Sequence, residues 1–189
     1  MRLFVALSIA EEIKDSLENA VDKLREARAP VRWVKHDGLH LTLKFLGETT
    51  EDKLNDLTES LKAVSGKVYP FDIVVEGMGA FPHPSRPRVV WVSVEEQTGT
   101  LSRLHRLVEE AVVSLGWAKE KRKFSPHVTL GRVKGNINLG KLEKEIGTMS
   151  DTLWGKQSVD NLVIYRSFLG PGGARYEVIR DFPLGRKLS

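Results

Sequence analysis

Residues 40–43 read His-Leu-Thr-Leu, and residues 127–130 read His-Val-Thr-Leu, 87 positions later. The surrounding sequence repeats with nearly the same spacing. An apolar, β-prone run, Arg2-Leu-Phe-Val-Ala-Leu-Ser8, resembles Arg88-Val-Val-Trp-Val-Ser-Val94, which begins 86 positions after it. Because a repeated order of sequence elements indicates a repeated architecture, these matches predict a chain built from two related halves.

Each half continues with the same order of helices and strands. The spacing of apolar residues predicts amphipathic helices at Glu11 to Arg28 and at Thr98 to Leu115. A second helix is predicted after each His-x-Thr strand, at Glu51 to Val64 and at Leu139 to Met149. Two further strands close each half: Phe71 to Gly79 with Arg88 to Val94, and Asn161 to Phe168 with Arg175 to Phe182. Gly170-Pro-Gly-Gly173 is typical of a hairpin connection.

This order of elements predicts an α+β fold of two pseudo-symmetric lobes. Each lobe is a duplicated βαβαββ-type half, and mainly antiparallel sheets line a central cleft. We expect a single bilobal domain over residues 1–189, with lobes at approximately 1–95 and 88–189 that interleave at the junction. The segment 95–99 between the halves is short and not rich in proline, which argues against a linker between separate domains.

The composition limits the possible classes of protein. The chain has no cysteine, which excludes disulfides, thiolate zinc sites, iron–sulfur clusters and cysteine nucleophiles. No stretch approaches the ~18 consecutive apolar residues of a membrane span. Met1 to Ala10 is too short for a signal peptide. We therefore expect a cytoplasmic protein without a membrane partner.

The two His-x-Thr triplets predict one paired site. Chance alone gives about a quarter of one such triplet in a chain of this composition, yet two occur at equivalent places in the repeat. Residues i and i+2 of a strand point to the same face, so His40 projects with Thr42, and His127 with Thr129. If the halves pack about an approximate two-fold axis, two imidazoles and two hydroxyls converge in the cleft.

These side chains fit acid–base chemistry better than the alternatives. A zinc site requires three or four protein ligands, whereas only two convergent histidines are present. A Ser-His-Asp site lacks a nucleophile motif such as Gly-x-Ser-x-Gly. One imidazole can take a proton from an attacking water, the other can give one to a leaving oxygen, and hydroxyls can donate to phosphate oxygens. The pattern therefore favours phosphodiester transfer by in-line displacement.

The motifs resemble those of a known superfamily. His40-Leu-Thr-Leu-Lys-Phe-Leu-Gly47 and Phe124-Ser-Pro-His-Val-Thr-Leu-Gly-Arg132 resemble the two His-x-Thr motifs of the two-histidine phosphoesterases. The chain is most similar to their LigT-like branch, the RNA 2',3'-cyclic phosphodiesterases, also called 2'-5' RNA ligases. The resemblance covers essentially the whole chain, including Gly79-Ala-Phe-Pro82 and Arg86-Pro-Arg-Val-Val-Trp91.

The resemblance implies a hydrolase that uses no metal and no other cofactor, and that opens a terminal RNA 2',3'-cyclic phosphate to a 2'-phosphate. It implies that His40 is the proton donor and His127 the proton acceptor, with Thr42 and Thr129 holding the phosphate. The near-symmetry of the motifs means that the sequence itself does not assign the two roles. The expected partner is RNA with a 2',3'-cyclic phosphate end, tRNA halves included, and the expected state is a monomer.

Three alternatives to this reaction stay open. Ligation of RNA halves through a 2'-5' bond is essentially the reverse reaction, so the same four residues would serve it. A non-catalytic RNA-binding module would need a basic surface and aromatic residues but not both imidazoles. A small cyclic nucleotide is a further substrate within the superfamily's range, against which the basic stretch described below argues.

Two cations near the motifs are weaker candidates for the site. Lys44 shares the strand parity of His40 and Thr42, so it either lines the cleft or faces solvent at the end of the strand. Arg132 has the wrong parity and reaches the site only if the strand twists or bulges near Gly131.

The aromatic residues near the motifs, and the other histidines, have simpler interpretations. Phe45, Phe81 and Trp33 are interpreted as core packing, with stacking on a terminal RNA base as the alternative. The remaining histidines have no partner in the repeat and are expected on the surface or on helices: His36, His83 and His105.

The positive charge of the chain is concentrated beside the second motif. The net charge of +4 divides into −2 for residues 1–95 and +6 for residues 96–189. Lys119 to Lys123 leads directly into Phe124-Ser-Pro-His127. This stretch is either a solvated loop or a track for the RNA backbone, and the second interpretation predicts RNA binding that weakens steeply with salt.

Overall fold

A computed structural model describes residues 1–170 and 173–185 of the chain. The strands in the first half of the chain are β1 (Arg2–Ser8), β2 (Val31–Trp33), β3 (His40–Glu48), β4 (Phe71–Phe81) and β5 (Val89–Glu95). Those in the second half are β6 (His127–Val133), β7 (Leu153–Val159), β8 (Asn161–Gly170) and β9 (Gly173–Pro183). The helices are α1 (Glu11–Arg25), the 3-10 helix η1 (His36–Gly38), α2 (Glu51–Ser65), α3 (Thr100–Ser114) and α4 (Leu139–Thr148).

The expected elements are present, and a few were not foreseen. All four expected α-helices occur, with ends within a few residues of the predicted ones. The structure adds β2, η1 and β7, which the sequence patterns did not predict. The predicted turn at 170–173 includes residues 171 and 172, which lie outside the described residues. The residues that flank them, Gly170 and Gly173, are paired across β8 and β9.

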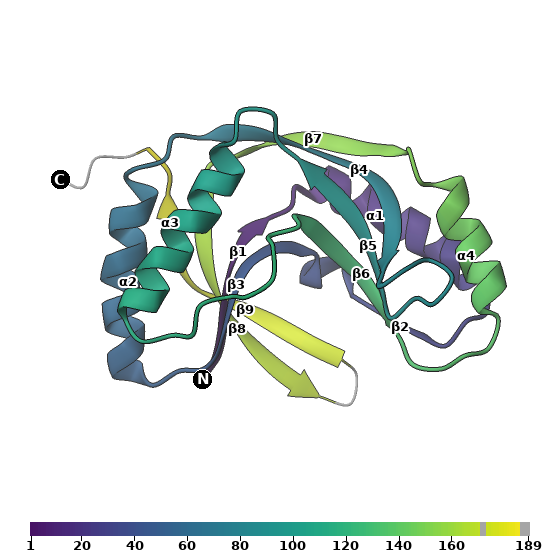
Figure 1. Cartoon of the computed structure of the whole chain (residues 1–189), viewed down its shortest axis with the longest axis horizontal. Helices are drawn as coiled ribbons and strands as arrows, with labels where there is room; N and C mark the ends of the chain where they lie inside the picture. Colours follow the sequence, from purple (N-terminus) through teal and green to yellow (C-terminus); the bar gives the residue numbers. More distant parts are fainter. Residues whose placement is uncertain (171–172, 186–189) are drawn as a thin grey trace.

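The strands of the described residues form one curled sheet (Figure 1). Their order is β7-β4-β5-β6-β3-β1-β8-β9, and β2 pairs with β6 beside this path. Every strand pairing is antiparallel. The predicted α+β class with a mainly antiparallel sheet is therefore confirmed. At the centre of the sheet, β3 and β6 meet through a single pair of residues, Leu41 and Val128.

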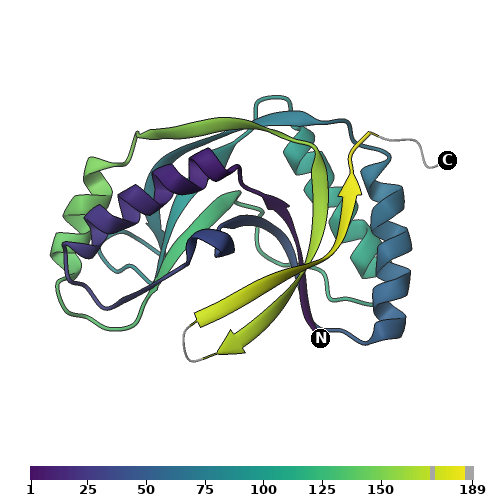
Figure 2. The same cartoon turned by 180° about the vertical axis from the view of Figure 1, so that it is seen from behind.

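The α-helices cover one face of the sheet in two pairs. The first pair, α1 and α4, packs against β7 and β4, while the second pair, α2 and α3, packs against β3, β8 and β9. Figures 1 and 2 show the two pairs at opposite ends of the molecule. The apolar stripe of α1 shows how the sequence drives this packing, because Ile13, Leu17 and Leu24 recur on one helix face and are all buried.

The chain passes back and forth between the two ends of the sheet. In the first half, β1 lies beside β3 and β8, but the helix that follows it packs against β7 and α4. At the junction of the two halves, β5 lies beside β4 and β6, but the helix that follows it, α3, packs against α2 and β3. The last strands, β8 and β9, return to the side of β1. The two halves of the sheet are therefore not the two halves of the chain.

Candidate active site

The two His-x-Thr motifs begin the two central strands. His40 is the first residue of β3 and His127 the first residue of β6, on either side of the point where these strands meet. The alternating leucines and valine of the motifs are buried in the core beneath the helices: Leu41, Leu43, Val128 and Leu130. The histidines and threonines are half-buried and point to the opposite, helix-free face. The expected side-chain directions are confirmed.

Both histidines are held in the same way. Nδ1 of His40 lies 2.7 Å from the carbonyl oxygen of Gly38, and Nδ1 of His127 lies 2.7 Å from the carbonyl oxygen of Ser125. Because a carbonyl oxygen only accepts hydrogen bonds, Nδ1 carries the proton in each ring. In the neutral imidazole Nε2 is then the basic nitrogen. The site therefore has two imidazoles of the same tautomer, each fixed by the carbonyl two residues before it.

Each histidine also faces a serine on the neighbouring strand. Ser8 of β1 is paired with His40, and Ser93 of β5 is paired with His127. The hydroxyl of Ser8 lies 2.9 Å from the hydroxyl of Tyr165. Sequence reasoning missed these serines because it aligned the two strand runs one position out of register. Aligning the runs by their alternation would have matched Ser8 with Ser93.

Aromatic rings enclose His40. The ring centroid of Phe4 lies 4.6 Å from that of His40, and those of Tyr176 and Tyr165 lie at 5.0 and 6.0 Å. Phe4 is buried, yet it lies outside the main core because it is on the helix-free face. The two tyrosines come from β8, which pairs with β1, and from β9, which pairs with β8, and nothing in the sequence indicates these pairings.

A different set of rings flanks His127. The ring centroid of Phe81 lies 5.1 Å from that of His127 in an edge-to-face arrangement, and that of Trp91 lies 6.5 Å away. The indole of Trp91 covers Gly79, where a Cβ atom would lie only 2.6 Å from the ring. Gly79 therefore allows Trp91 to lie close to the strand. Phe81 packs on the histidine and not in the main core that was expected for it.

Burial changes the protonation of His40. Desolvation is the main cause that lowers the pKa of His40 to about 4, and the hydrogen bond to Gly38 acts in the opposite direction. His40 is therefore a neutral imidazole near pH 7 in the free protein. An anion that binds beside the ring would favour the charged form and raise this pKa.

A β-bulge follows the threonine in both central strands. In β3, Thr42 is paired with Ala6 but Lys44 with the preceding Val5, so Leu43 is an extra residue. In β6, Thr129 and Gly131 are likewise paired with neighbouring residues of β5, and Leu130 is the extra residue. An extra residue reverses the alternation of side chains beyond it. The residues after each bulge therefore face opposite to the direction that simple parity predicts.

The bulge in β3 removes Lys44 from the site. Its side chain is 7% exposed and lies on the helix side of the sheet. Lys44 Nζ donates to Glu109 Oε1 and to the carbonyl oxygen of Ala118, both at 2.8 Å. The expectation that Lys44 either lines the cleft or faces solvent is therefore wrong, because the parity argument did not include the bulge.

The bulge in β6 brings Arg132 to the helix-free face. Arg132 is exposed and lies close enough to Tyr176 that its guanidinium acts to lower the pKa of that phenol, against the larger effect of burial. The sequence predicts that Arg132 reaches the site only if the strand twists or bulges near Gly131, and the structure has a bulge at Leu130. Phe45 occupies the equivalent position after the bulge in β3 and is 67% exposed, so its interpretation as a core residue is wrong.

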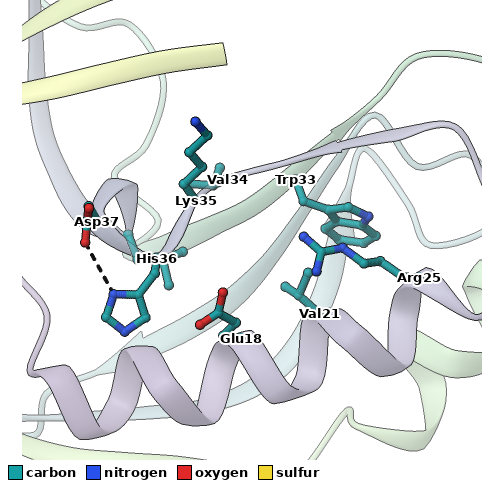
Figure 3. Close-up of a pocket in the computed structure, with 9 residues that line it drawn as sticks. Glu18, Val21, Arg25, Trp33, Val34, Lys35, His36 and Asp37 are labelled. Carbon is teal, nitrogen blue, oxygen red and sulfur yellow. Dashed lines mark ion pairs between the residues drawn. The ribbon is translucent and has the colours of Figure 1, made fainter. Parts of the chain in front are cut away.

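The other aromatic and histidine residues noted in the sequence lie away from the two motif histidines. Trp33 packs against the core and against Gly131, in agreement with its interpretation as a packing residue. A surface cavity of about 300 Å³ lies between α1 and residues 33–39, and its lining includes Trp33 and His36 but neither motif histidine (Figure 3). His36 contacts Asp15 at 2.9 Å, and His105 of α3 stacks on Phe124.

In residues 1–170 and 173–185, no group of three or more histidine, aspartate or glutamate side chains is placed to hold a metal ion. No helix within these ranges is long and apolar enough to cross a membrane.

The family pattern described as the 2'-5' RNA ligase superfamily matches residues 13–167 of this sequence. A protein from Methanothermobacter thermautotrophicus named RNA 2',3'-cyclic phosphodiesterase is 36% identical over 184 residues, which cover 97% of this chain and 99% of that protein. A protein of the same name from Archaeoglobus fulgidus is 37% identical over 183 residues, covering 96% of this chain and 99% of that protein.

Solved structures show the same fold. A Thermus thermophilus protein superimposes with a TM-score of 0.80 at 31% identity and covers 98% of both chains. LigT from E. coli, solved in complex with 3'-AMP, superimposes with a TM-score of 0.75 at 26% identity, again over 98% of both chains. The similarity thus extends over the curled sheet and the helices on its outer face.

Proposed function

The chain belongs to the 2'-5' RNA ligase superfamily, and we propose that it is an RNA 2',3'-cyclic phosphodiesterase that opens the terminal cyclic phosphate to a 2'-phosphomonoester. The observation that carries this proposal is the matched pair of imidazoles, each with Nδ1 bound to a backbone carbonyl. Two such rings on one face suit a reaction in which one proton is removed while another is delivered. The names of the relatives support the same activity.

The proposed reaction is an in-line displacement at phosphorus. Nε2 of His127 takes a proton from water, and the water oxygen forms a bond to phosphorus as the bond to the 3'-oxygen breaks. Nε2 of His40, protonated at the start, gives its proton to the departing 3'-oxygen. After the reaction His127 is protonated and His40 is neutral, the reverse of the starting state. Proton exchange with solvent then restores the enzyme. This order of roles follows the resemblance to the family.

The threonines and Arg132 are proposed to bind the phosphate. Thr42 and Thr129 each lie two residues from a histidine on the same face, which supports the proposal that their hydroxyls donate to the two non-bridging oxygens. Such donors stabilise the negative charge that develops on these oxygens in the transition state. Arg132, on the same face near Tyr176, adds positive charge beside the phosphate.

The low pKa of His40 is compatible with a proton donor once substrate is bound. The free site disfavours the imidazolium because the half-buried ring of His40 is partly desolvated. The phosphate diester carries a negative charge, and its arrival beside the ring stabilises the positive form. We therefore expect the substrate itself to contribute to charging its proton donor.

The decisive experiment is to incubate the protein with an RNA oligomer that ends in a 2',3'-cyclic phosphate and to identify the product. A 2'-phosphate is expected, with activity that persists in EDTA because the chemistry needs no metal. Replacing His40 or His127 by Ala should each lower the rate by two or more orders of magnitude while RNA affinity largely survives. Full activity in either variant would contradict the acid–base pair, and a 3'-phosphate would contradict the proposed roles.

Ligation through a 2'-5' bond is the second candidate, favoured by the family to which the chain belongs. A 5'-hydroxyl would replace water as the attacking group, and the same four residues would act. The same incubation, with an acceptor RNA bearing a 5'-hydroxyl, would yield a joined strand in that case. We further propose that the protein acts in the cytoplasm as a monomeric, single bilobal unit and that tRNA halves are among its substrates.

A further inference from the structure

Phe45 is an exposed aromatic ring at the edge of the candidate active site. It is paired with Phe4 across β1 and β3, so the two side chains share the helix-free face. The ring centroids of Phe45 and Phe4 are 6.0 Å apart, and Phe4 lies 4.6 Å from His40. A continuous row of rings therefore leads from the histidine to an exposed end at Phe45, which is 67% exposed.

A single exposed apolar side chain is common on protein surfaces and needs a second observation to indicate a site. The second observation is the basic segment Lys119 to Lys123, which is held along the same part of β3. Trp117 Nε1 donates to the carbonyl oxygen of Leu46 at 3.0 Å, and Lys44 Nζ donates to that of Ala118 at 2.8 Å. Figure 1 shows the connection between α3 and β6, which contains this segment, running past β3.

The segment is fixed at its centre as well. Glu109 Oε1 accepts the backbone N–H of Glu120 at 2.6 Å while it holds Lys44. The side chain of Glu120 accepts the N–H groups of the next two residues, which orders the turn. The cations of the segment are exposed, and within residues 1–170 and 173–185 none of them forms an ion pair: Lys119, Lys121, Arg122 and Lys123.

We propose that Phe45 and this basic segment form a subsite for the nucleotide that precedes the terminal one in the RNA strand. The inference rests on the proposed function and deepens it. A base has an apolar face that stacks on an exposed ring, and a phosphodiester requires positive charge beside that ring. In the proposed function, Thr42, Thr129 and Arg132 bind the terminal cyclic phosphate beside the two histidines. Several further cations beyond the terminal site therefore indicate a second phosphate, which an RNA strand longer than one nucleotide supplies.

The test compares two substrates on one set of variants. The first substrate is adenosine 2',3'-cyclic monophosphate, and the second is a short oligoadenylate that ends in the same cyclic phosphate. The readout is the ratio of kcat/KM for the oligomer to kcat/KM for the mononucleotide. Phe45→Ala should lower this ratio roughly 5- to 100-fold, the effect of losing one stacked base, and Phe45→Trp should retain it.

Two further variants complete the test. Tyr69 is 77% exposed and lies in the segment that leads into β4, so Tyr69→Ala is the matched control and should leave the ratio unchanged. Replacing both Lys121 and Lys123 by Gln should make the salt dependence of oligomer binding less steep, by about 1.4 in the slope of log K against log salt. Circular dichroism of each variant verifies that the fold is retained.

The outcomes separate this inference from the proposed function. If the wild-type protein turns over neither substrate, the proposed function fails. If the wild-type protein turns over both substrates but Phe45→Ala leaves the ratio of kcat/KM values unchanged, the subsite is contradicted. It is also contradicted if replacing both Lys121 and Lys123 leaves the salt dependence of oligomer binding unchanged. Phe45 would then be a candidate contact for a protein partner instead.

Discussion

Burial lowers the pKa of His40 to about 4, and the proposed role of this residue requires the protonated form. The first prediction therefore concerns the imidazole itself. Binding of adenosine 2'-monophosphate, the expected type of product, should raise the pKa of His40 by at least about one pH unit because an anion within a few ångströms favours the imidazolium. NMR titration of the His40 ring protons, with and without saturating nucleotide, measures this directly. The His40→Asn variant assigns the signal, and an unchanged pKa at saturation would rule out phosphate binding beside His40.

Lys44 illustrates how a residue can be misplaced by a sound local rule. It lies two residues beyond Thr42, and alternation alone puts both on one face. The bulge at Leu43 places Lys44 against Glu109 instead, in a buried pair at 2.8 Å. A bulge depends on how two strands pair, and the alternation of apolar and polar residues in one strand does not predict it.

The second prediction follows from this buried pair. Lys44→Met should destabilise the protein by about 3–5 kcal/mol because it leaves the Glu109 carboxylate buried without its partner. Glu109 Oε2 already has no hydrogen-bond partner within the described residues, which adds to this cost. Urea unfolding measures the change. The double variant Lys44→Met with Glu109→Leu removes both charges and should be more stable than Lys44→Met alone. A loss below about 1 kcal/mol in the single variant would contradict a tightly coupled pair.

At the scale of elements, the bulge in each central strand determines which of its side chains share the helix-free face. Each bulge separates a His-x-Thr segment that faces the site from a following residue, Phe45 or Arg132, that faces the site as well. In β6, Gly131 follows the extra residue of the bulge and precedes Arg132. It lies against the side chains of Trp33 and Val31 in β2. A Cβ atom there would lie 2.7 Å from both Trp33 and Val31.

The third prediction tests this close approach. Gly131→Ala should destabilise the protein by about 1–3 kcal/mol because the added methyl group overlaps β2. The matched control is Gly147→Ala in α4, where a Cβ atom meets nothing within 4 Å. That change should be neutral or stabilise by up to about 1 kcal/mol, since alanine favours a helix more than glycine does. Thermal unfolding of the two variants provides the comparison, and equal melting temperatures would argue against contact between β2 and the bulge.

The elements that the sequence predicted and those that it missed differ in one physical respect. The four helices carry apolar residues at helical spacing, so their buried faces are visible in the sequence, as in Ile13, Leu17 and Leu24 of α1. The strand β2 has only three residues, and β7 reads Leu-Trp-Gly-Lys-Gln-Ser-Val, without an apolar run. Both have few buried side chains and are fixed by hydrogen bonds to β6 and β4.

At the scale of the whole molecule, the repeat predicted which residues form the pair but not how the lobes are assembled. The two His-x-Thr motifs, 87 positions apart, were sufficient to place four side chains on one face. The rings around His40 were not predictable because Tyr165 and Tyr176 belong to strands at the end of the chain. Of those strands, β8 pairs with β1 and β9 pairs with β8, and long-range pairing of this kind leaves no signal in a single sequence.

The last prediction follows from this exchange of elements. If the chain is divided after Glu95, the fragment 1–95 keeps β1 and β4 but loses β8 and β7, with which they pair. Its helix α1 also loses its contacts with β7 and α4. Neither 1–95 nor 96–189 should therefore show a cooperative thermal transition by circular dichroism when studied alone. Mixed together, the fragments supply every missing strand, and each brings one of the two motif histidines, so both the transition and hydrolysis of a cyclic phosphate end should return. A fragment that melted cooperatively on its own would show that one half folds without the other, and the site would then be formed by two independent lobes.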